Sequence, residues 1–464
     1  MKYKKHSNEK SNMLFVFVLT IVMTGGFSSA FVMAAVQDET ITEKPLTLEK
    51  AIKLVLVNDR QYKIARLQVD IATNRSDQAR SALLPQLSFS ASKMWLKDPV
   101  EINLPEFDLE FRSPTELPLS LSAQVAVPIY IGGTIPNYLS ARRLEMSEAQ
   151  IAERTRQTLV FNATKAYYAI LQTKHLLEVA QESVELMEAY KERAKDFYNE
   201  GIVDKRDFLQ AELRLAEIRQ QLFSVDKQHK LAVAMFNKMI DRDIDHPTIV
   251  LDDTSPTPLN IDQNHCNQLA LTHRPELKQL QAEVSAARLA LQAAKGATLP
   301  SIVGVASAQY SDSDFLDRDV IIYGGINVTL DAYSGGKKWA QISEASNRNL
   351  QASLALDELK QNLKLQVKDA WLSVQEARNK LSVTEFAIEE AQENLRIVNN
   401  QYEAQVVSST EVLDAQTFLT NARNNHFQAL YQFKTARAQL EWVLGFNIEQ
   451  AQLIAQNSAV TEKN

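Results

Sequence analysis

The sequence predicts a mixed α/β membrane protein built from very long coiled-coil helices and a few short strands. Three observations predict it: proline-free stretches too long for ordinary globular helices, apolar seams inside these stretches, and pairs of alternating segments between them. The chain of 464 residues is 45% hydrophobic and 23% charged, so it has enough apolar side chains to bury a large core.

Composition also excludes several function classes. The formal net charge of −7 argues against a nucleic-acid binder, and the single cysteine, Cys266, excludes a disulfide framework or a four-cysteine zinc site. The seven histidines and nine methionines show no ligand spacing, and neither a phosphate-binding loop nor a Gly-x-Ser-x-Gly elbow is present. A periplasmic hydrolase is therefore the weaker alternative, and we expect no enzyme, no metal and no cofactor.

The amino-terminal segment has the pattern of a secretory signal peptide. Lysines precede the apolar run Met13–Met23, and small residues follow up to Ala34. The run is too short to span a bilayer as a helix, so we expect residues 1–34 to be removed on export.

Proline spacing predicts the long helices. No proline lies between Pro136 and Pro247, and none follows Pro300. A helix over residues 137–200 would be about 96 Å long at about 1.5 Å per residue, which favours a coiled coil. The best seam keeps 4-3-4-3 spacing through Leu363, Val367, Ala370, Val374, Ala377, Leu381, Thr384, Ile388, Ala391, Leu395, Val398 and Tyr402.

The chain also repeats itself. Landmarks of the first half recur in the second half at offsets of 215, 203 and 204 residues, which predicts a tandem duplication of a unit of about 200 residues. The matched pairs are Ala79–Pro85 with Ala294–Pro300, Pro128–Gly133 with Asp331–Gly336, and Asp207–Ala211 with Glu411–Ala415.

Each half contains two segments with strand alternation. We expect strands at about 86–96 and 119–130, and again at about 301–310 and 320–331, joined by polar loops over 97–117 and 311–319. Strands of about 10 residues with alternating faces are typical of outer-membrane barrels. Four strands cannot close a barrel, so either several chains share one barrel or the strands form a small soluble sheet. The signal peptide favours the shared barrel.

These observations divide the chain into five parts. They are the signal peptide 1–34, a first repeat 45–246 with a long hairpin at about 137–240, a linker 247–262, a second repeat 263–445 with a long hairpin at about 337–445, and a tail 446–464.

Several short motifs, in this order, resemble the TolC family of outer-membrane efflux proteins. They are Leu84–Pro85, Gly132–Gly133, Tyr198–Val203, Arg274–Leu277, Leu299–Pro300, Gly335–Gly336, Glu411–Gln416 and Leu440–Gly445. The resemblance covers the whole chain after residue 34. It implies a homotrimer in which four strands per chain form one 12-stranded barrel in the outer membrane and the helices continue as a periplasmic α-barrel.

The same resemblance implies a function. The trimer would be the passive exit duct of a tripartite multidrug efflux pump or a type I secretion system, carrying drugs, toxins or secreted polypeptides. It would open at its periplasmic tip when a periplasmic adaptor protein and an inner-membrane pump of the RND, ABC or MFS type dock. The linker and the tail resemble the family's belt around the middle of the tunnel.

The resemblance also points to residues at the tip. It implies that the adaptor meets both hairpin turns and that a second group of residues holds the tip closed. The second turn has Gln405 where the family usually has glycine. The docking residues are Gly201, Ile202, Val203, Gln405, Val406 and Val407, and the gating contacts are Arg206, Asp207 and Tyr402.

Glu411 and Asp414 are the candidate pore constriction. They lie three residues apart, hence on one face of a helix, and match acidic positions that face the pore in the family. Threefold symmetry would make two carboxylate rings, which favour cations. The alternative is that both are solvated surface acids.

A periplasmic adaptor is the main alternative function, because adaptors are also exported and contain helical hairpins. Adaptors carry glycine- and valine-rich β-domains around one hairpin, whereas this sequence has two complete halves and only 12 glycines. The duct is therefore the favoured hypothesis.

Overall fold

The structure is a computed structural model that describes residues 45–99, 101–104, 109–112, 115–117, 119–252, 262–312 and 319–446. The predicted signal peptide, most of the predicted linker and the tail beyond Phe446 lie outside these residues. The described elements of the first half are α2 (Leu48–Asn58), α3 (Arg60–Ser81), β1 (Gln86–Ser92), β2 (Glu101–Leu104), β3 (Leu109–Arg112), β4 (Ser120–Tyr130), α4 (Thr134–Asn199) and α5 (Lys205–Met239).

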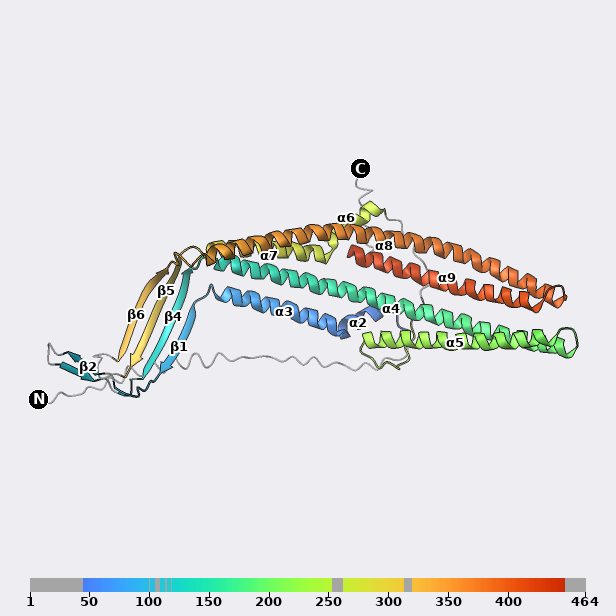
Figure 1. Ribbon diagram of the computed structural model, residues 1–464, viewed down its shortest axis with the longest axis horizontal. Helices are drawn as coiled ribbons and strands as arrows, with labels where there is room; N and C mark the ends of the chain where they lie inside the picture. The colour runs from blue at the N-terminus through green and yellow to red at the C-terminus, as the bar shows by residue number, and fades with distance from the viewer. Residues whose placement is uncertain are drawn as a thin grey trace. The chain divides into compact units, whose positions relative to one another are not determined.

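The second half has the same order of elements. It contains α6 (Gln263–His273), α7 (Pro275–Gly296), β5 (Ser301–Ser311), β6 (Val320–Thr329), α8 (Lys337–Glu403) and α9 (Ser409–Leu444). Each half is thus a short helix, a medium helix, a strand pair and a long helical hairpin, α4–α5 or α8–α9 (Figure 1). The predicted fold class, long helices with four strands in one sheet, is confirmed.

The four strands form one antiparallel sheet in the order β1-β4-β5-β6, so β1 and β6 are its outer strands. Apolar residues share one face: Phe89 pairs with Ala123, and Leu121 pairs with Tyr310. Small polar residues share the other face, where the Ser90 and Ser122 hydroxyls are 2.7 Å apart. The alternation seen in the sequence therefore gives a sheet with one apolar face and one mainly polar face, on which Val303, Val305 and Ile321 are apolar exceptions.

One strand expectation needs correction. Strand β1 ends at Ser92, and Trp95 instead forms an isolated bridge with Glu116. Within the connection predicted as a polar loop, β2 and β3 pair as a short hairpin. A four-residue strand has too few alternating positions to stand out from a polar loop in the sequence.

The predicted seams are buried inside the hairpins. On α8, Leu363, Val367 and Ala370 are at most 1% exposed, and burial continues along the seam to Tyr402. On α9, Leu419 and Ala429 pack on the same side. Small alanine side chains at many seam positions let the two helix backbones come close. The seam prediction is therefore confirmed.

The core is widest where α2, α6 and the ends of α5 and α9 pack against α4 and α8. Its largest fully buried side chains include Ile170, Phe236, Tyr431 and Leu440. None of the helices in the described ranges contains a stretch long and apolar enough to cross a membrane.

The first residues of the predicted linker are tied to this core. Leu46 pairs with Val250, and the Tyr167 hydroxyl donates to the Leu46 carbonyl at 2.9 Å. Asp252 accepts from both the His175 ring, at 2.6 Å, and the Tyr431 hydroxyl, at 3.2 Å. The described start of the linker is therefore held against α4 and α9.

Candidate functional site

The two hairpin turns adopt the same backbone geometry. In the first, the Ile202 N–H donates to the Phe197 carbonyl at 2.9 Å, and Gly201 has φ of +74°. In the second, the Val406 N–H donates to the Gln401 carbonyl at 2.8 Å, and Gln405 has φ of +57°. Both turns are glycine-type helix ends, so the second one holds glutamine in the left-handed region that favours glycine.

The side chains proposed for docking differ in exposure. Ile202 is 41% exposed and Val406 is 71% exposed, while Val203 and Val407 are half-buried. Val407 packs against a small apolar cluster that the two hairpins share near the turns. One large apolar side chain on each turn is therefore available to a partner.

Glu411 has a local structural role. Its carboxylate accepts from the backbone N–H of Ser408 at 3.5 Å, which completes a capping box at the start of α9. Asp207 occupies the corresponding position in the first turn of α5. Both Glu411 and Asp414 are exposed in the single chain, and their place in a pore stays a prediction.

The three predicted gating residues lie near one another, since Arg206 and Tyr402 are both close to Asp207. Tyr402 is 4% exposed and packs between Tyr190 and Phe197, with ring centroids 5.7 and 5.8 Å away. Its buried hydroxyl makes no hydrogen bond of regular geometry to Asp207 or to any other described residue. Burial raises the pKa of Tyr402, and the nearby Asp207 carboxylate raises it further.

Arg206 contributes only a weak contact. Its Nε lies 4.0 Å from Asp207 Oδ1, and its side chain is 78% exposed. No ion pair joins Arg206 to Glu411 among the ion pairs of the described residues. Among the described residues of one chain, therefore, no hydrogen bond or ion pair of Arg206, Asp207 or Tyr402 joins the two hairpins, and Tyr402 contributes only the packing of its ring against α4.

Other residues make that connection. Arg193 on α4 pairs with Glu403 on α8 at 2.9 Å, and Arg214 on α5 donates to Thr417 on α9 at 2.6 Å. We call the full set the cross-hairpin ladder. It comprises Arg193–Glu403, Tyr190 to the Ser409 carbonyl, Arg214–Thr417, Ser183–Thr420 and Glu182–Arg423.

The cross-hairpin ladder is polar, whereas the seams inside each hairpin are apolar. The sequence analysis missed these residues. Charged residues flanking a seam are a recognisable signal, but the choice of partner on another hairpin depends on how the helices are rotated, which the sequence pattern does not specify.

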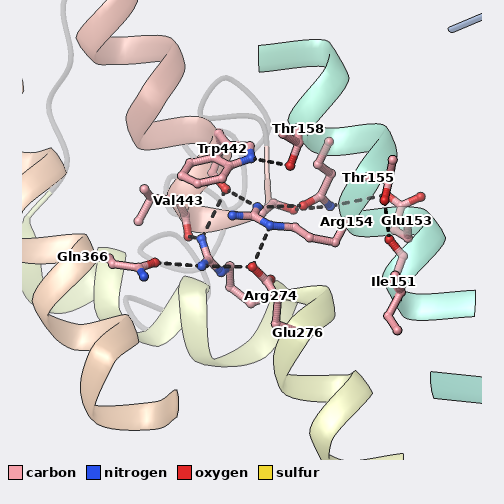
Figure 2. A network of polar contacts seen from close by, with 12 residues as sticks. Ile151, Glu153, Arg154, Thr155, Thr158, Arg274, Glu276, Gln366, Trp442 and Val443 are labelled. Carbon is pink, nitrogen blue, oxygen red and sulfur yellow. Dashed lines mark hydrogen bonds and ion pairs between the residues drawn. The ribbon is translucent and has the colours of Figure 1, made fainter. Parts of the chain in front are cut away.

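A second polar cluster lies where α9 ends, shown in Figure 2. Arg274, only 2% exposed, donates to the Val443 carbonyl and to Gln366, both at 2.8 Å. Its guanidinium also lies 3.2 Å from the Glu276 carboxylate. Arg274 therefore satisfies a free carbonyl at the end of α9 while joining α7 to α8.

Arg154 on α4 completes this cluster. Its Nε is 2.6 Å from Glu276, and its guanidinium lies 3.9 Å above the Trp442 ring (Figure 2). Burial, together with the neighbouring Arg274 charge, lowers the pKa of Arg154 to about 10. Two guanidinium groups and one carboxylate thus fasten the end of α9 to α4 and α7. The sequence motif indicates Arg274, Glu276 and Trp442 but not Arg154.

Within the described ranges, no group of three or more His, Cys, Asp or Glu side chains has the geometry of a metal site. His229 on α5 and His426 on α9 are half-buried, and burial lowers the pKa of both rings. The Nδ1 atom of His426 is buried without a hydrogen-bond partner. A lowered pKa favours the neutral form of both rings.

The described fold thus consists of two matched helical hairpins joined through a shared four-stranded sheet. The chain belongs to the outer membrane efflux protein family, whose family model matches residues 51–240 and 267–446. This family contains the TolC-like efflux channels, as the motifs indicate. The match favours the channel over the periplasmic adaptor.

Solved structures support the same fold. CusC matches with a TM-score of 0.75 and 19% identity over 86% of this chain and 92% of its own. The CmeC outer-membrane channel of Campylobacter jejuni matches with a TM-score of 0.76 and 16% identity over 86% and 85% of the two chains. The open state of the Neisseria gonorrhoeae MtrE outer-membrane channel matches with a TM-score of 0.70 and 16% identity over 86% and 89%. Comparison with curated protein sequences gives no match.

Proposed function

We propose that three copies of this chain form an outer-membrane channel-tunnel, the exit duct of a tripartite efflux pump or a type I secretion system. One observation carries the proposal: the family match covers both hairpins and both strand pairs of a chain whose sheet has one apolar and one mainly polar face. Twelve strands, four per chain, would close one barrel, because a closed barrel leaves no backbone edge unpaired in the membrane. The apolar face of the sheet would then face the lipid.

The proposed duct is passive and is not an enzyme. An inner-membrane pump and a periplasmic adaptor would supply the energy and the substrate, and drugs, toxins or secreted polypeptides would pass through. The exposed Ile202 and Val406 support docking at the turns, since large apolar side chains on a protruding turn favour a protein partner.

The gate would lie at the hairpin turns. The MtrE channel was solved in an open state, which supports a channel of this fold that opens. In this chain the ion pairs of the cross-hairpin ladder, Arg193–Glu403 and Glu182–Arg423, would separate at a low cost of about 0–1 kcal/mol each, and the apolar cluster that the hairpins share around Tyr402 would part with them. Separating the apolar seams inside a hairpin would expose far more apolar area.

Below the gate, Glu411 and Asp414 would form two rings of carboxylates around the threefold axis. Both side chains are exposed in the single chain and lie on the first turns of α9. Rings of carboxylates at a constriction attract cations and repel anions.

The test is the current through a planar bilayer that contains the purified protein. We expect a small, stable, cation-selective conductance that loses its selectivity in a Glu411→Ala, Asp414→Ala variant. A variant with Glu389→Ala and Glu390→Ala, two exposed acids farther along α8, is the matched control and should keep the selectivity.

The outcomes test the carboxylate rings and the duct separately. Equal selectivity in all three proteins would refute the carboxylate rings and leave the duct. The absence of any conductance from folded, trimeric protein would refute the duct itself.

A further inference from the structure

The first residues of the linker contact both hairpins through one side chain. Asp252 Oδ2 lies 2.6 Å from Nε2 of His175 on α4, and Asp252 Oδ1 accepts from the Tyr431 hydroxyl on α9 at 3.2 Å. The Asp252 side chain is 19% exposed, so water competes little for either contact. A single carboxylate therefore joins the hairpin α4–α5 to the hairpin α8–α9.

The backbone that carries Asp252 is held in place as well. The Leu46 N–H donates to the Ile249 carbonyl at 2.9 Å, and the Leu251 N–H donates to the Leu46 carbonyl at 3.0 Å. Val250 is 4% exposed and belongs to the main apolar core. The amides of Leu46 and Leu251 lose their acceptors when this segment leaves, so their hydrogen exchange reports whether the start of the linker is docked.

His175 lies between two carboxylates. Its Nε2 faces Asp252, and its Nδ1 lies 2.8 Å from Glu178 Oε2 on the same helix. A neutral imidazole has one N–H and the protonated ring has two, so only the protonated ring donates to both carboxylates. The Phe427 ring stacks on the imidazole with centroids 4.5 Å apart and planes 4° from parallel, which holds the ring plane toward both acceptors.

Other charged and titratable groups surround this ring. On α4, Lys174 Nζ lies 3.7 Å from Glu178 Oε1, and on α9, Lys434 Nζ lies 5.6 Å from the centroid of the Tyr431 ring. On α5, the His229 ring lies 3.1 Å from a threonine hydroxyl of α4. Histidine is the side chain that ordinarily changes its charge between about pH 5 and 8, so the imidazole between the two carboxylates is the group in contact with them that titrates in this range.

We propose that His175 and Asp252 form a proton-dependent clasp, which holds the start of the linker across the two hairpins while the His175 ring is protonated. Loss of the proton removes the positive charge between the two carboxylates. The neutral ring then either keeps its N–H toward Asp252 without that charge or turns a lone pair toward the Asp252 carboxylate. An ion pair loses its Coulomb attraction when one partner becomes neutral, so the clasp weakens in both cases.

The direction of the pH dependence follows from the docked state. Docking adds the Asp252 carboxylate to a ring that has Glu178 beside it in either state. Docking therefore favours the protonated ring, and by linkage protonation favours docking. The clasp is closed at about pH 5.5 and loosens toward about pH 8.5. The link to α9 does not titrate in this range, because burial raises the pKa of Tyr431 and the Asp252 carboxylate raises it further.

The clasp lies far from the hairpin turns. Roughly 36 Å of helix, at about 1.5 Å per residue, separate His175 from the end of α4 at Asn199. On α9 the clasp contacts Tyr431, beyond the ladder contact of Ser183 with Thr420. It therefore restrains the two hairpins near their middle, and its release would ease their separation at the tip. This consequence for gating rests on the proposed function, whereas the clasp itself does not.

The test is amide hydrogen exchange of the full chain in detergent at about pH 5.5 and about pH 8.5, read as protection factors of the peptides that contain Leu46 and Leu251. In the unmodified protein the protection should fall about tenfold from the lower to the higher pH, the order of one charge-assisted contact. His175→Gln and Asp252→Asn each keep a polar side chain without the charge, so their protection should be equal at both pH values. The matched control is His229→Gln on the neighbouring α5, half-buried as well, which should keep the tenfold change.

Two results of this experiment would overturn the clasp. One is equal protection of both peptides at the two pH values in the unmodified protein. The other is a pH dependence that survives in His175→Gln or in Asp252→Asn, since another group would then be the cause. Protection around Leu363, in the buried seam of α8, reports that each variant is folded.

Bilayer recordings at the same two pH values test the clasp separately from the duct. Longer channel openings at the higher pH, with no such difference in His175→Gln, would show that the clasp restrains the gate. If the exchange result holds and the openings do not change with pH, the clasp stands and its role in gating is wrong. If folded protein gives the exchange result without any conductance, the proposed function falls and the clasp stands.

Discussion

Replacing Arg274 by methionine should release the end of α9 from the rest of the core. Arg274 is 2% exposed and binds the Val443 carbonyl, Gln366 and Glu276. Methionine keeps much of the apolar volume but leaves the buried Val443 carbonyl without its donor. Losing one partner of a buried charged network costs about 3–5 kcal/mol.

We expect the lower end of that range. Glu276 keeps its ion pair with Arg154 at 2.6 Å, so no carboxylate is left unpaired. A loss of about 3 kcal/mol corresponds to about a hundredfold increase in the population of the opened helix end. The effect should be local, because the seam of α8 and α9 farther along the hairpin is untouched.

Amide hydrogen exchange measures this opening directly. In Arg274→Met, amides of the last turns of α9 should exchange about a hundredfold faster, while those near Leu419 stay protected. The matched control is Arg348→Met, since Arg348 is 72% exposed and pairs with Glu344 on its own helix. If both variants exchange alike at the end of α9, the buried network does not hold the helix and the reasoning is refuted.

Three other perturbations follow from the hairpins. Gln405→Gly should stabilise the second turn by about 1 kcal/mol, because only glycine adopts φ of +57° without strain, and Gly201→Ala should destabilise the first turn by a similar amount in urea unfolding. His426 has a pKa lowered by burial, so the unfolded chain binds its proton first and stability should fall as pH drops below about 6.5. In thermal melts His426→Gln should flatten this fall, and an unchanged slope would contradict it. Arg193→Gln and Glu403→Gln should lengthen channel openings in bilayer recordings to the same extent, because each removes the same ion pair between the hairpins. Additive effects in the double variant would exclude their pairing.

Much of the architecture can be predicted from the sequence. The spacing of Leu363, Val367 and Ala370 predicts a buried seam, and these residues are fully buried. The duplication offsets even predict strand register, since Gln86 with Ala126 and Ser301 with Thr329 obey them. Periodicity and repetition are properties of one chain read in order, so no knowledge of its neighbours in space is needed.

The sequence predicts less of the candidate site than of the fold. The positions of both turns were predicted, because Gly201 and its counterpart Gln405 stand at the ends of seam-bearing helices. The polar links between the hairpins, such as Arg193 with Glu403 and Arg214 with Thr417, were not predicted. The gating role of Arg206, Asp207 and Tyr402 remains a prediction for the assembled channel.

The sequence by itself determined the helices, their buried seams, the strand pairs and the duplication that relates the two halves. The tertiary structure alone decided that Arg154 joins Arg274 at the end of α9, that a short hairpin interrupts the first loop, and which polar residues bridge the hairpins. The physical reason is that burial periodicity is set by helix and strand geometry, which is local. The partner of a long polar side chain depends on the rotation and offset of a second helix, which only the packing of the whole chain fixes.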